Sequence, residues 1–190
     1  MPTLEERVQR LEDIEDIRRL KVRYAGFADA QYDPDGLASC FTDDAVWDGG
    51  SAFGVYHGKP AIRTFFAGVS QQITFALHYM VGHIIDIAPS GNEASGTWYL
   101  FVPATMNGRA VWMAATYDDR YRKVGGQWLC SQMKVNVAFI TPYETGWVKE
   151  RVVSSYSDTR KKFRFFGPAR LSARAASVLP KTPGSLVALL

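Results

Sequence analysis

Three residues, Tyr24, Asp29 and His78, combine side-chain types that can remove a proton from carbon. Tyr24 and Asp29 lie five positions apart near the end of one predicted helix, and His78 follows in a later strand-like run. A carboxylate that holds an imidazole orients the ring and stabilises its charged form, so the ring can act as a general base. The phenol of Tyr24 can donate a hydrogen bond to a departing hydroxyl or a developing oxyanion. If the fold brings these side chains together, they predict proton removal without a cofactor.

Each of these residues also has a purely structural interpretation. Asp29 lies among apolar neighbours, where a buried carboxylate would need a partner. Its structural interpretation is an exposed acid at the end of the helix. His78 could be a core residue, and Tyr24 could fill the seam between helix and sheet. His83 is the competing histidine, expected on the opposite face of the same strand, and His57 is expected to be exposed. The sequence leaves these alternatives open.

The first 70 residues are predicted to be mostly helical. Thr3 and Glu6 form a capping box, and apolar residues then recur every three or four positions, which indicates an amphipathic helix ending near Gln31. Turn residues at 33–36 start a short helix over 37–41. A brief strand at 45–47 and a glycine-rich stretch precede Pro60, which is well placed to begin a helix that runs to about Val69.

The second half of the chain has the pattern of a β-sheet. Four long runs of strand-forming residues, 74–88, 94–106, 109–124 and 127–140, are separated by PSGN, NG and GG, which are typical of hairpin turns. Such strands form an antiparallel meander that curls strongly. With helices packed on one face, the fold class is α+β, a curved antiparallel sheet packed on N-terminal helices.

Composition and charge indicate one globular domain with a basic extension. The 190 residues are 47% hydrophobic and 22% charged, and their aromatic content of 13% suits either a core or a pocket for a flat ligand. Residues 151–190 hold eight Lys or Arg against one acid, Asp158. We expect a catalytic domain over 1–150 and a basic arm over 151–190. The arm has no nucleic-acid reading motif, so a solvated or oligomer-contacting segment is the favoured interpretation.

Two cysteines, Cys40 and Cys130, lie far apart with no metal-ligand spacing, so we expect buried reduced thiols and no metal site. The N-terminus lacks the apolar stretch of a secretory signal, and no run has the roughly 20 apolar residues of a membrane helix. These features predict a cytoplasmic protein that binds neither membrane nor nucleic acid.

The order of several short motifs resembles the SnoaL-like branch of the NTF2-like superfamily over about residues 3–148. The motifs are Tyr24-x4-Asp29, LASCFTDDAVW at 37–47, GKPAIRTFF at 58–66, His78, GTWYL at 96–100, WLCSQMKVN at 128–136 and FITPYETGW at 139–147. The resemblance implies a cone-shaped half-barrel. It also implies a homo-oligomer, a trimer or a dimer.

Within this superfamily the chain looks most like cofactor-independent lyases, namely bile acid dehydratase, scytalone dehydratase and hexachlorocyclohexane dehydrochlorinase. Lignin-derived diarylpropane lyases, which release formaldehyde, belong to the same superfamily. The resemblance implies that Asp29 and His78 form the catalytic pair, with Tyr24 assisting, in the catabolism of an aromatic or polycyclic compound. It implies substrate-binding positions at Trp47, Trp98, Tyr117 and Met133, and we add His83 to these.

Two auxiliary positions depart from the relatives. A second catalytic histidine of scytalone dehydratase falls near Ala104, and a second aspartate of the bile acid enzyme falls near Val102. Elimination chemistry is therefore expected with a different substrate. The alternatives are a non-catalytic ligand-binding or oxygenase-subunit-like module, and an isomerase or cyclase that uses the same base.

Overall fold

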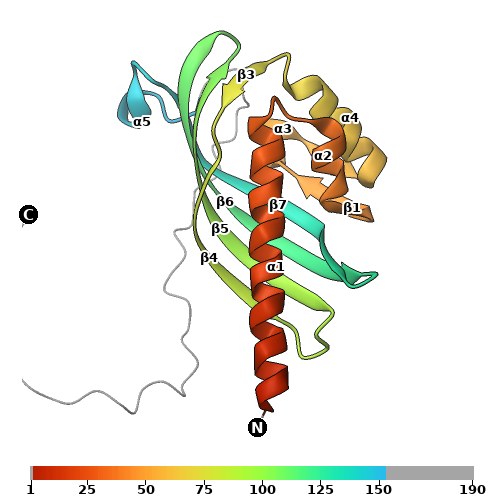
Figure 1. Cartoon of the computed structure of the whole chain (residues 1–190). Coiled ribbons are helices and arrows are strands. Elements are labelled where there is room, and N and C mark those ends of the chain that lie inside the picture. Colours follow the sequence, from red (N-terminus) through yellow and green to blue (C-terminus); the bar gives the residue numbers. More distant parts are fainter. Residues whose placement is uncertain (1, 153–190) are drawn as a thin grey trace, which may run out of the picture. The chain divides into compact units, whose positions relative to one another are not determined.

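The computed structural model describes residues 2–152, which form a long helix laid over a curled sheet (Figure 1). The predicted arm after Val152 lies outside the described residues. The elements in chain order are α1 (Leu4–Asp29), α2 (Pro34–Ser39), β1 (Phe41–Asp48), α3 (Gly50–Phe53), β2 (Val55–His57), α4 (Lys59–Val69), β3 (Ile73–Ala76), β4 (Tyr79–Ile87), β5 (Glu93–Met106), β6 (Arg109–Val124), β7 (Gln127–Pro142) and α5 (Gly146–Lys149).

The sheet has seven strands in the order β2-β1-β7-β6-β5-β3, and β4 also pairs with β5. The long strands β4 to β7 are antiparallel, as the hairpin turns predicted. The strand predicted at 45–47 is longer than expected, and as β1 it pairs in parallel with β7. The sheet is therefore a mixed half-barrel, and the predicted α+β fold with a curled sheet under N-terminal helices is confirmed.

The run predicted as one strand over 74–88 is interrupted at Leu77 and His78, between β3 and β4. The physical reason is that the backbone N–H of His78 donates to the Asp29 carboxylate (2.8 Å). A strand would have placed that group in the sheet ladder. The prediction that His78 lies within a strand was wrong in this detail, and the break lets β3 and β4 pair with different parts of β5.

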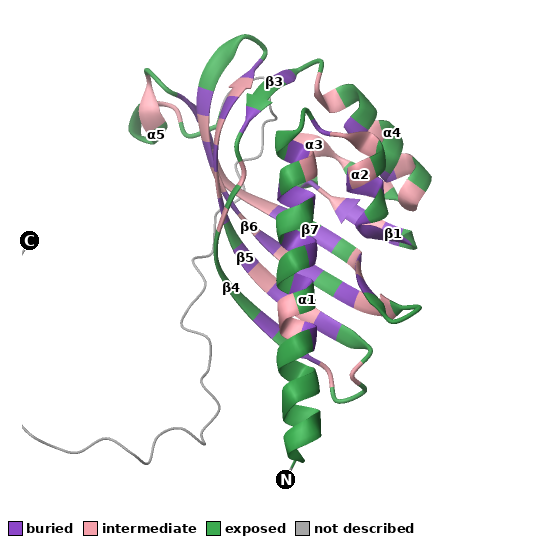
Figure 2. Ribbon diagram, viewed as in Figure 1, coloured by how far each residue is buried: buried purple, intermediate pink, exposed green. Residues whose placement is uncertain are grey.

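Helix α1 begins and packs as its sequence pattern predicts. The Thr3 backbone N–H donates to Glu6 Oε2 (2.7 Å) and the Glu6 N–H donates to Thr3 Oγ1 (3.1 Å), which completes the capping box. The buried residues begin at Asp13 and then follow one stripe to Ala28, whereas the first turns are exposed. In Figure 1 α1 lies over the concave face of the sheet, and Figure 2, drawn from the same side, shows the purple buried positions on the sheet beneath it.

Side chains alternate between buried and less buried positions along β5 and β6, as expected for strands with one face on a core. Cys40 and Cys130 are both free and buried, as predicted. His57 is exposed, also as predicted. No helix among residues 2–152 is both long and apolar enough to span a membrane.

A buried carboxylate, Asp13, fixes α1 to the far end of the sheet. Asp13 Oδ1 accepts hydrogen bonds from Lys123 Nζ (2.6 Å), Trp128 Nε1 (3.0 Å) and Gln9 Nε2 (3.4 Å). Burial alone would raise the pKa of Asp13, but these hydrogen bonds outweigh it, so the pKa lies below its usual value of 3.8. Because the folded state favours the ionised form, this contribution to stability is complete above 3.8 and is lost as the pH falls through the lowered pKa.

Replacing Asp13 with asparagine is expected to lower the free energy of unfolding by about 1.5–3 kcal/mol at neutral pH, the usual range for hydrogen bonds to a charged group. The difference from the natural protein should shrink as the pH falls below 3.8, because Asp13 is then protonated. Urea unfolding across this range measures both effects. Asp16→Asn, an exposed site on the same helix, is the matched control. A difference that does not change with pH would contradict this account.

Candidate active site

Asp29 and His78 meet at the end of α1. The distance between Asp29 Oδ1 and His78 Nδ1 is 2.7 Å, and the same oxygen accepts the backbone N–H of His78. The His78 side chain is 9% exposed and that of Asp29 is 30% exposed. Since a carboxylate can only accept, Nδ1 carries the hydrogen and Nε2 of the neutral ring is left without one. The pair therefore has the arrangement of a base with its orienting carboxylate.

His78 faces a narrow apolar cavity of about 50 Å³. The cavity lies between α1, the helices α3 and α4, and the sheet. Aromatic and aliphatic side chains form most of its wall, and the lining residues are Tyr24, Tyr32, Trp47, Phe53, Phe65, Phe66, Val69, Ile73, His78, Leu100, Val102, Ala104, Met106, Met113, Tyr117 and Val135. Asp29 is not among them, so the carboxylate contacts the imidazole from outside the cavity.

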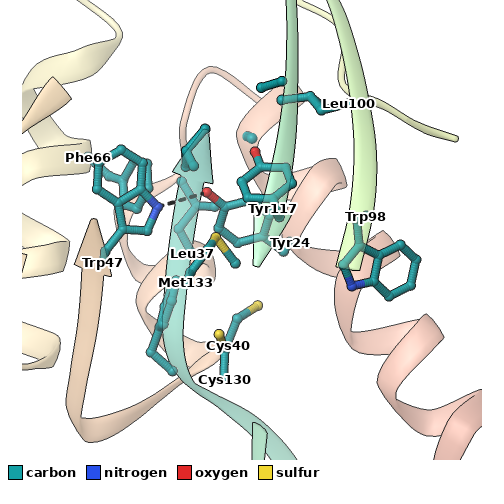
Figure 3. Packing of buried hydrophobic residues seen from close by; sticks show 14 of the residues in the cluster. Tyr24, Leu37, Cys40, Trp47, Phe66, Trp98, Leu100, Tyr117, Cys130 and Met133 are labelled. Atoms are coloured by element: carbon teal, nitrogen blue, oxygen red, sulfur yellow. Dashed lines mark hydrogen bonds between the residues drawn. The ribbon is translucent and has the colours of Figure 1, made fainter. Parts of the chain in front are cut away.

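Two buried phenols, Tyr24 and Tyr117, lie on the cavity wall. Tyr24 is 4% exposed and Tyr117 is 3% exposed, and their rings meet edge to face at 6.3 Å. Burial raises the pKa of both hydroxyls, so both stay protonated. The Tyr24 oxygen accepts from Trp47 Nε1 (3.3 Å), as the dashed line in Figure 3 shows. Because that bond uses a lone pair, the proton of Tyr24 stays available for donation.

A third phenol, Tyr32, was missed by the sequence analysis. Its ring lies edge to face with the His78 ring at 5.7 Å and stacks on Phe66 at 6.3 Å. Tyr32 and the preceding Gln31 both have φ of 57°, a left-handed conformation that non-glycine residues adopt at a cost of about 1–2 kcal/mol each. The strained turn directs Tyr32 back under the end of α1. Its position next to the Asp33-Pro34 turn was the signal in the sequence.

The structure brings some of the predicted binding residues to the cavity and leaves others away from it. Trp47 and Tyr117 line the cavity. Met133 is buried in the core of β7 without lining it, and Figure 3 shows Trp98 apart from the cluster around Tyr24. His83 stacks on Trp98 at 4.9 Å, and both line a separate groove along α1. Trp98 and His83 therefore line a different groove from the cavity beside His78, and their predicted role in binding stays a prediction.

No group of three His, Cys, Asp or Glu side chains within residues 2–152 could hold a metal ion. Cys130 is buried and burial raises its thiol pKa well above the usual value, as it does to a smaller extent for Cys40. Neither thiol lines the cavity. The groups on its wall that can exchange a proton are the imidazole and the three phenols.

The fold and this site define the class of the protein. A family model for the SnoaL-like domain matches residues 9–134, and the chain belongs to that family, within the NTF2-like superfamily.

Solved structures with the same fold include three bacterial proteins. A candidate aromatic ring hydroxylase from Novosphingobium aromaticivorans is 26% identical, with a TM-score of 0.65, over 70% of this chain and 94% of that one. A candidate scytalone dehydratase from the same organism is 21% identical, also with a TM-score of 0.65, over 71% of this chain and 90% of its own. A hexachlorocyclohexane dehydrochlorinase from Novosphingobium barchaimii is 21% identical, with a TM-score of 0.64, over 71% of this chain and 92% of its own. The distant structural relatives of this chain thus include dehydratases and dehydrochlorinases.

Proposed function

We propose that this protein is a cofactor-independent lyase that eliminates water, or a small group such as formaldehyde, from a hydroxylated aromatic or polycyclic substrate. The observation that carries the proposal is the 2.7 Å contact between Asp29 and His78, made where the imidazole faces an apolar cavity. A histidine paired in this way is a general base. The apolar wall excludes water and strengthens each hydrogen bond that the site makes.

The elimination assigns one role to each polar group. His78 Nε2 takes a proton from a carbon that a carbonyl or phenol-derived group makes acidic, and the electron pair of that C–H bond becomes the new double bond. The leaving hydroxyl departs with its bonding pair and receives the proton that the imidazolium has taken, which forms water and restores the neutral base. Tyr24 is placed to assist by hydrogen bonding to that oxygen, and Asp29 stabilises the imidazolium that forms. For loss of formaldehyde, His78 instead takes the proton of a CH₂OH hydroxyl, and the O–H electron pair forms the C=O bond of formaldehyde. The C–C bond breaks, its electron pair passes to the neighbouring carbonyl-type electron sink, and the imidazolium returns the proton to the remaining product.

The lining of the cavity supports a flat and largely apolar substrate. His78 is the only basic side chain that lines the cavity, and no carboxylate lines the wall. Trp47, Phe65 and Phe66 present rings to the interior, with Trp47 and Phe65 at 4.8 Å and Trp47 and Phe66 at 5.6 Å. Aromatic surfaces of this kind suit a planar ligand. The names of the structural relatives, a dehydratase, a dehydrochlorinase and an aromatic ring hydroxylase, agree with this substrate class.

A binding module is the second candidate, and the crowding of the cavity favours it. Phe65 lies 4.9 Å from Phe66 and 4.8 Å from Trp47, and all three rings line the cavity, so they leave little room inside it. A ligand would then be held without reacting. An isomerase or cyclase would use the same base and differs only in its product.

One experiment separates the three functions. The full-length chain is incubated with a panel of hydroxylated aromatic and polycyclic compounds, and the products are followed by mass spectrometry. A lyase gives a product lighter by water or formaldehyde, whereas an isomerase gives a product of unchanged mass. Binding without any conversion would support the ligand-binding module and refute the lyase.

The homo-oligomer that the family resemblance implies stays a prediction. Large apolar side chains are exposed on the sheet, among them Tyr79, Val81, Ile84 and Tyr99, and these would suit a contact with further copies of the chain.

A further inference from the structure

A fully buried ion pair lies beside the cavity and has no role in the proposed elimination. Lys21 of α1 and Asp119 of β6 have side chains that are 1% and 0% exposed, and the distance from Lys21 Nζ to Asp119 Oδ2 is 2.7 Å. The same carboxylate oxygen accepts a hydrogen bond from the Tyr121 hydroxyl (2.6 Å). Lys21 is one helical turn before Tyr24 on the same helix, so the pair adjoins the phenols of the cavity wall.

The ammonium group of Lys21 contacts aromatic rings as well as the carboxylate. Its nitrogen lies 3.5 Å from the ring centre of Tyr117, 5.4 Å from that of Tyr24 and 5.8 Å from that of Trp98. Cations within about 6 Å of a ring centre attract its π electrons, and the effect is strongest where water is absent. The shortest of the three distances is to Tyr117, which lines the cavity.

The position of the ion pair calls for a role other than stability. A buried ion pair is weak evidence for stabilisation, because apolar side chains of the same volume often serve the fold as well. A cation at the face of a phenol ring withdraws electron density from it, and this makes the O–H group a stronger hydrogen-bond donor. Tyr24 and Tyr117 both stay protonated, and both line the cavity.

We infer that Lys21 and Asp119 are positioning residues that act through the phenols of Tyr117 and Tyr24, so that the cavity preferentially binds an oxygen bearing negative charge. The ligand class is then a phenol or an enol, whose oxygen gains negative charge when it is ionised or when a proton leaves the adjacent carbon. Asp119 holds the Lys21 ammonium against the rings. The ammonium withdraws electron density from each ring, and this strengthens the ring's hydroxyl as a hydrogen-bond donor. The inference rests on the proposed function for the step in which this charge develops.

The first test uses the natural full-length chain and a series of para-substituted phenols, from 4-methylphenol through 4-chlorophenol and 4-cyanophenol to 4-nitrophenol. Titration calorimetry at one neutral pH gives the dissociation constants. We expect affinity to rise with the acidity of the phenol by roughly tenfold across the series, the factor that a desolvated cation–π interaction supports. Affinity that is unchanged or falls along the series, or the absence of binding, would overturn the inference.

The second test removes the ion pair. The double variant Lys21→Met/Asp119→Asn lacks both charges at similar volume, and it should lose the roughly tenfold preference for the more acidic phenols. The matched control Arg63→Met/Asp35→Asn removes an exposed ion pair (Arg63 Nε to Asp35 Oδ1, 2.6 Å) by the same substitutions and should keep the preference. Lys21→Arg retains a cation and should keep it too. If circular dichroism shows the double variant to be unfolded, Lys21→Leu/Asp119→Leu replaces it.

The route through Tyr117 is tested by combining substitutions. Tyr117→Phe should reduce the preference for acidic phenols, and removing the ion pair in that background should then have little further effect, because the two changes interrupt the same route. Independent, additive losses would show that the ion pair does not act through Tyr117. These measurements involve no turnover, so the inference can fail while base catalysis by His78 stands, and the reverse also holds.

Discussion

His78→Ala is expected to reduce turnover by about 10²–10⁴-fold, the range that general base catalysis contributes, with little change in the fold. The reason is that no other lining group can take a proton near neutral pH: Tyr24 and Tyr117 have pKa values raised by burial. The measurement is kcat on the substrate that the panel identifies, together with a circular dichroism spectrum. His57→Ala, the same substitution at an exposed histidine, should leave kcat unchanged.

Asp29→Asn is expected to reduce turnover within the same range. An amide oxygen still accepts the backbone N–H of His78, so the chain should fold as before. The amide cannot stabilise the imidazolium as a carboxylate does, and its NH₂ group can instead donate to Nδ1 and favour the tautomer in which Nε2 carries the hydrogen. The loss should therefore lie in kcat more than in KM. Asp16→Asn serves as control, and an unchanged rate in either Asp29→Asn or His78→Ala would reject the assignment of the base.

Local signals in the sequence were sufficient for most of the elements. The capping box at Thr3, the three-to-four spacing of α1 and the glycine-containing turns are short-range patterns, and α1 and the hairpins β5–β6 and β6–β7 form where these patterns predict. The parallel pairing of β1 with β7 was not predicted, because it joins segments about 85 positions apart. A local pattern carries no information about such a partner.

Irregularities in the strands explain what was missed at the site. Strict alternation predicts that His83 faces away from His78, but Gly82, with φ of 69°, coincides with a register shift between Val81 and His83. The shift makes His83 the partner of Trp98, on which it stacks. The left-handed turn at Gln31 and Tyr32 was also not predicted. Its conformation depends on packing, because neither residue is of a type that prefers positive φ. The contact between Asp29 and His78, by contrast, was implied by the resemblance to the SnoaL-like lyases and not by a local pattern.

The two buried carboxylates, Asp13 and Asp119, should respond to pH in opposite directions. Asp13 has a lowered pKa, so its contribution to stability grows as the pH rises from the lowered pKa and is complete above 3.8. Burial raises the pKa of Asp119, although Lys21 opposes this, so its folded state favours the protonated form. Its contribution is complete below the usual value of 3.8 and is lost as the pH rises through the raised pKa. The Lys21 ammonium limits that loss because it pairs with the ionised carboxylate, so removing the ammonium should make the loss larger.

Lys21→Met alone is expected to lower the free energy of unfolding by about 3–5 kcal/mol near neutral pH, because it leaves an unpaired carboxylate in a dry interior. Asp119 would keep only the Tyr121 hydroxyl as donor, since its Oδ1 has no hydrogen-bond partner even in the natural protein. Total stabilities are about 5–15 kcal/mol, so this single change could unfold the domain. Urea unfolding measures the effect, and Arg63→Met at the exposed ion pair should have little effect.

The pattern across variants separates loss of charge pairing from loss of packing. If the unpaired carboxylate is the cause, Lys21→Met/Asp119→Asn should recover most of the stability, because no charge remains to be paired. The destabilisation of the single variant should also be smaller in acid, where Asp119 is protonated. A double variant as unstable as Lys21→Met, with no dependence on pH, would instead mean that the aliphatic chain of Lys21 matters through its packing against Tyr117, and that the ammonium contributes little to the fold.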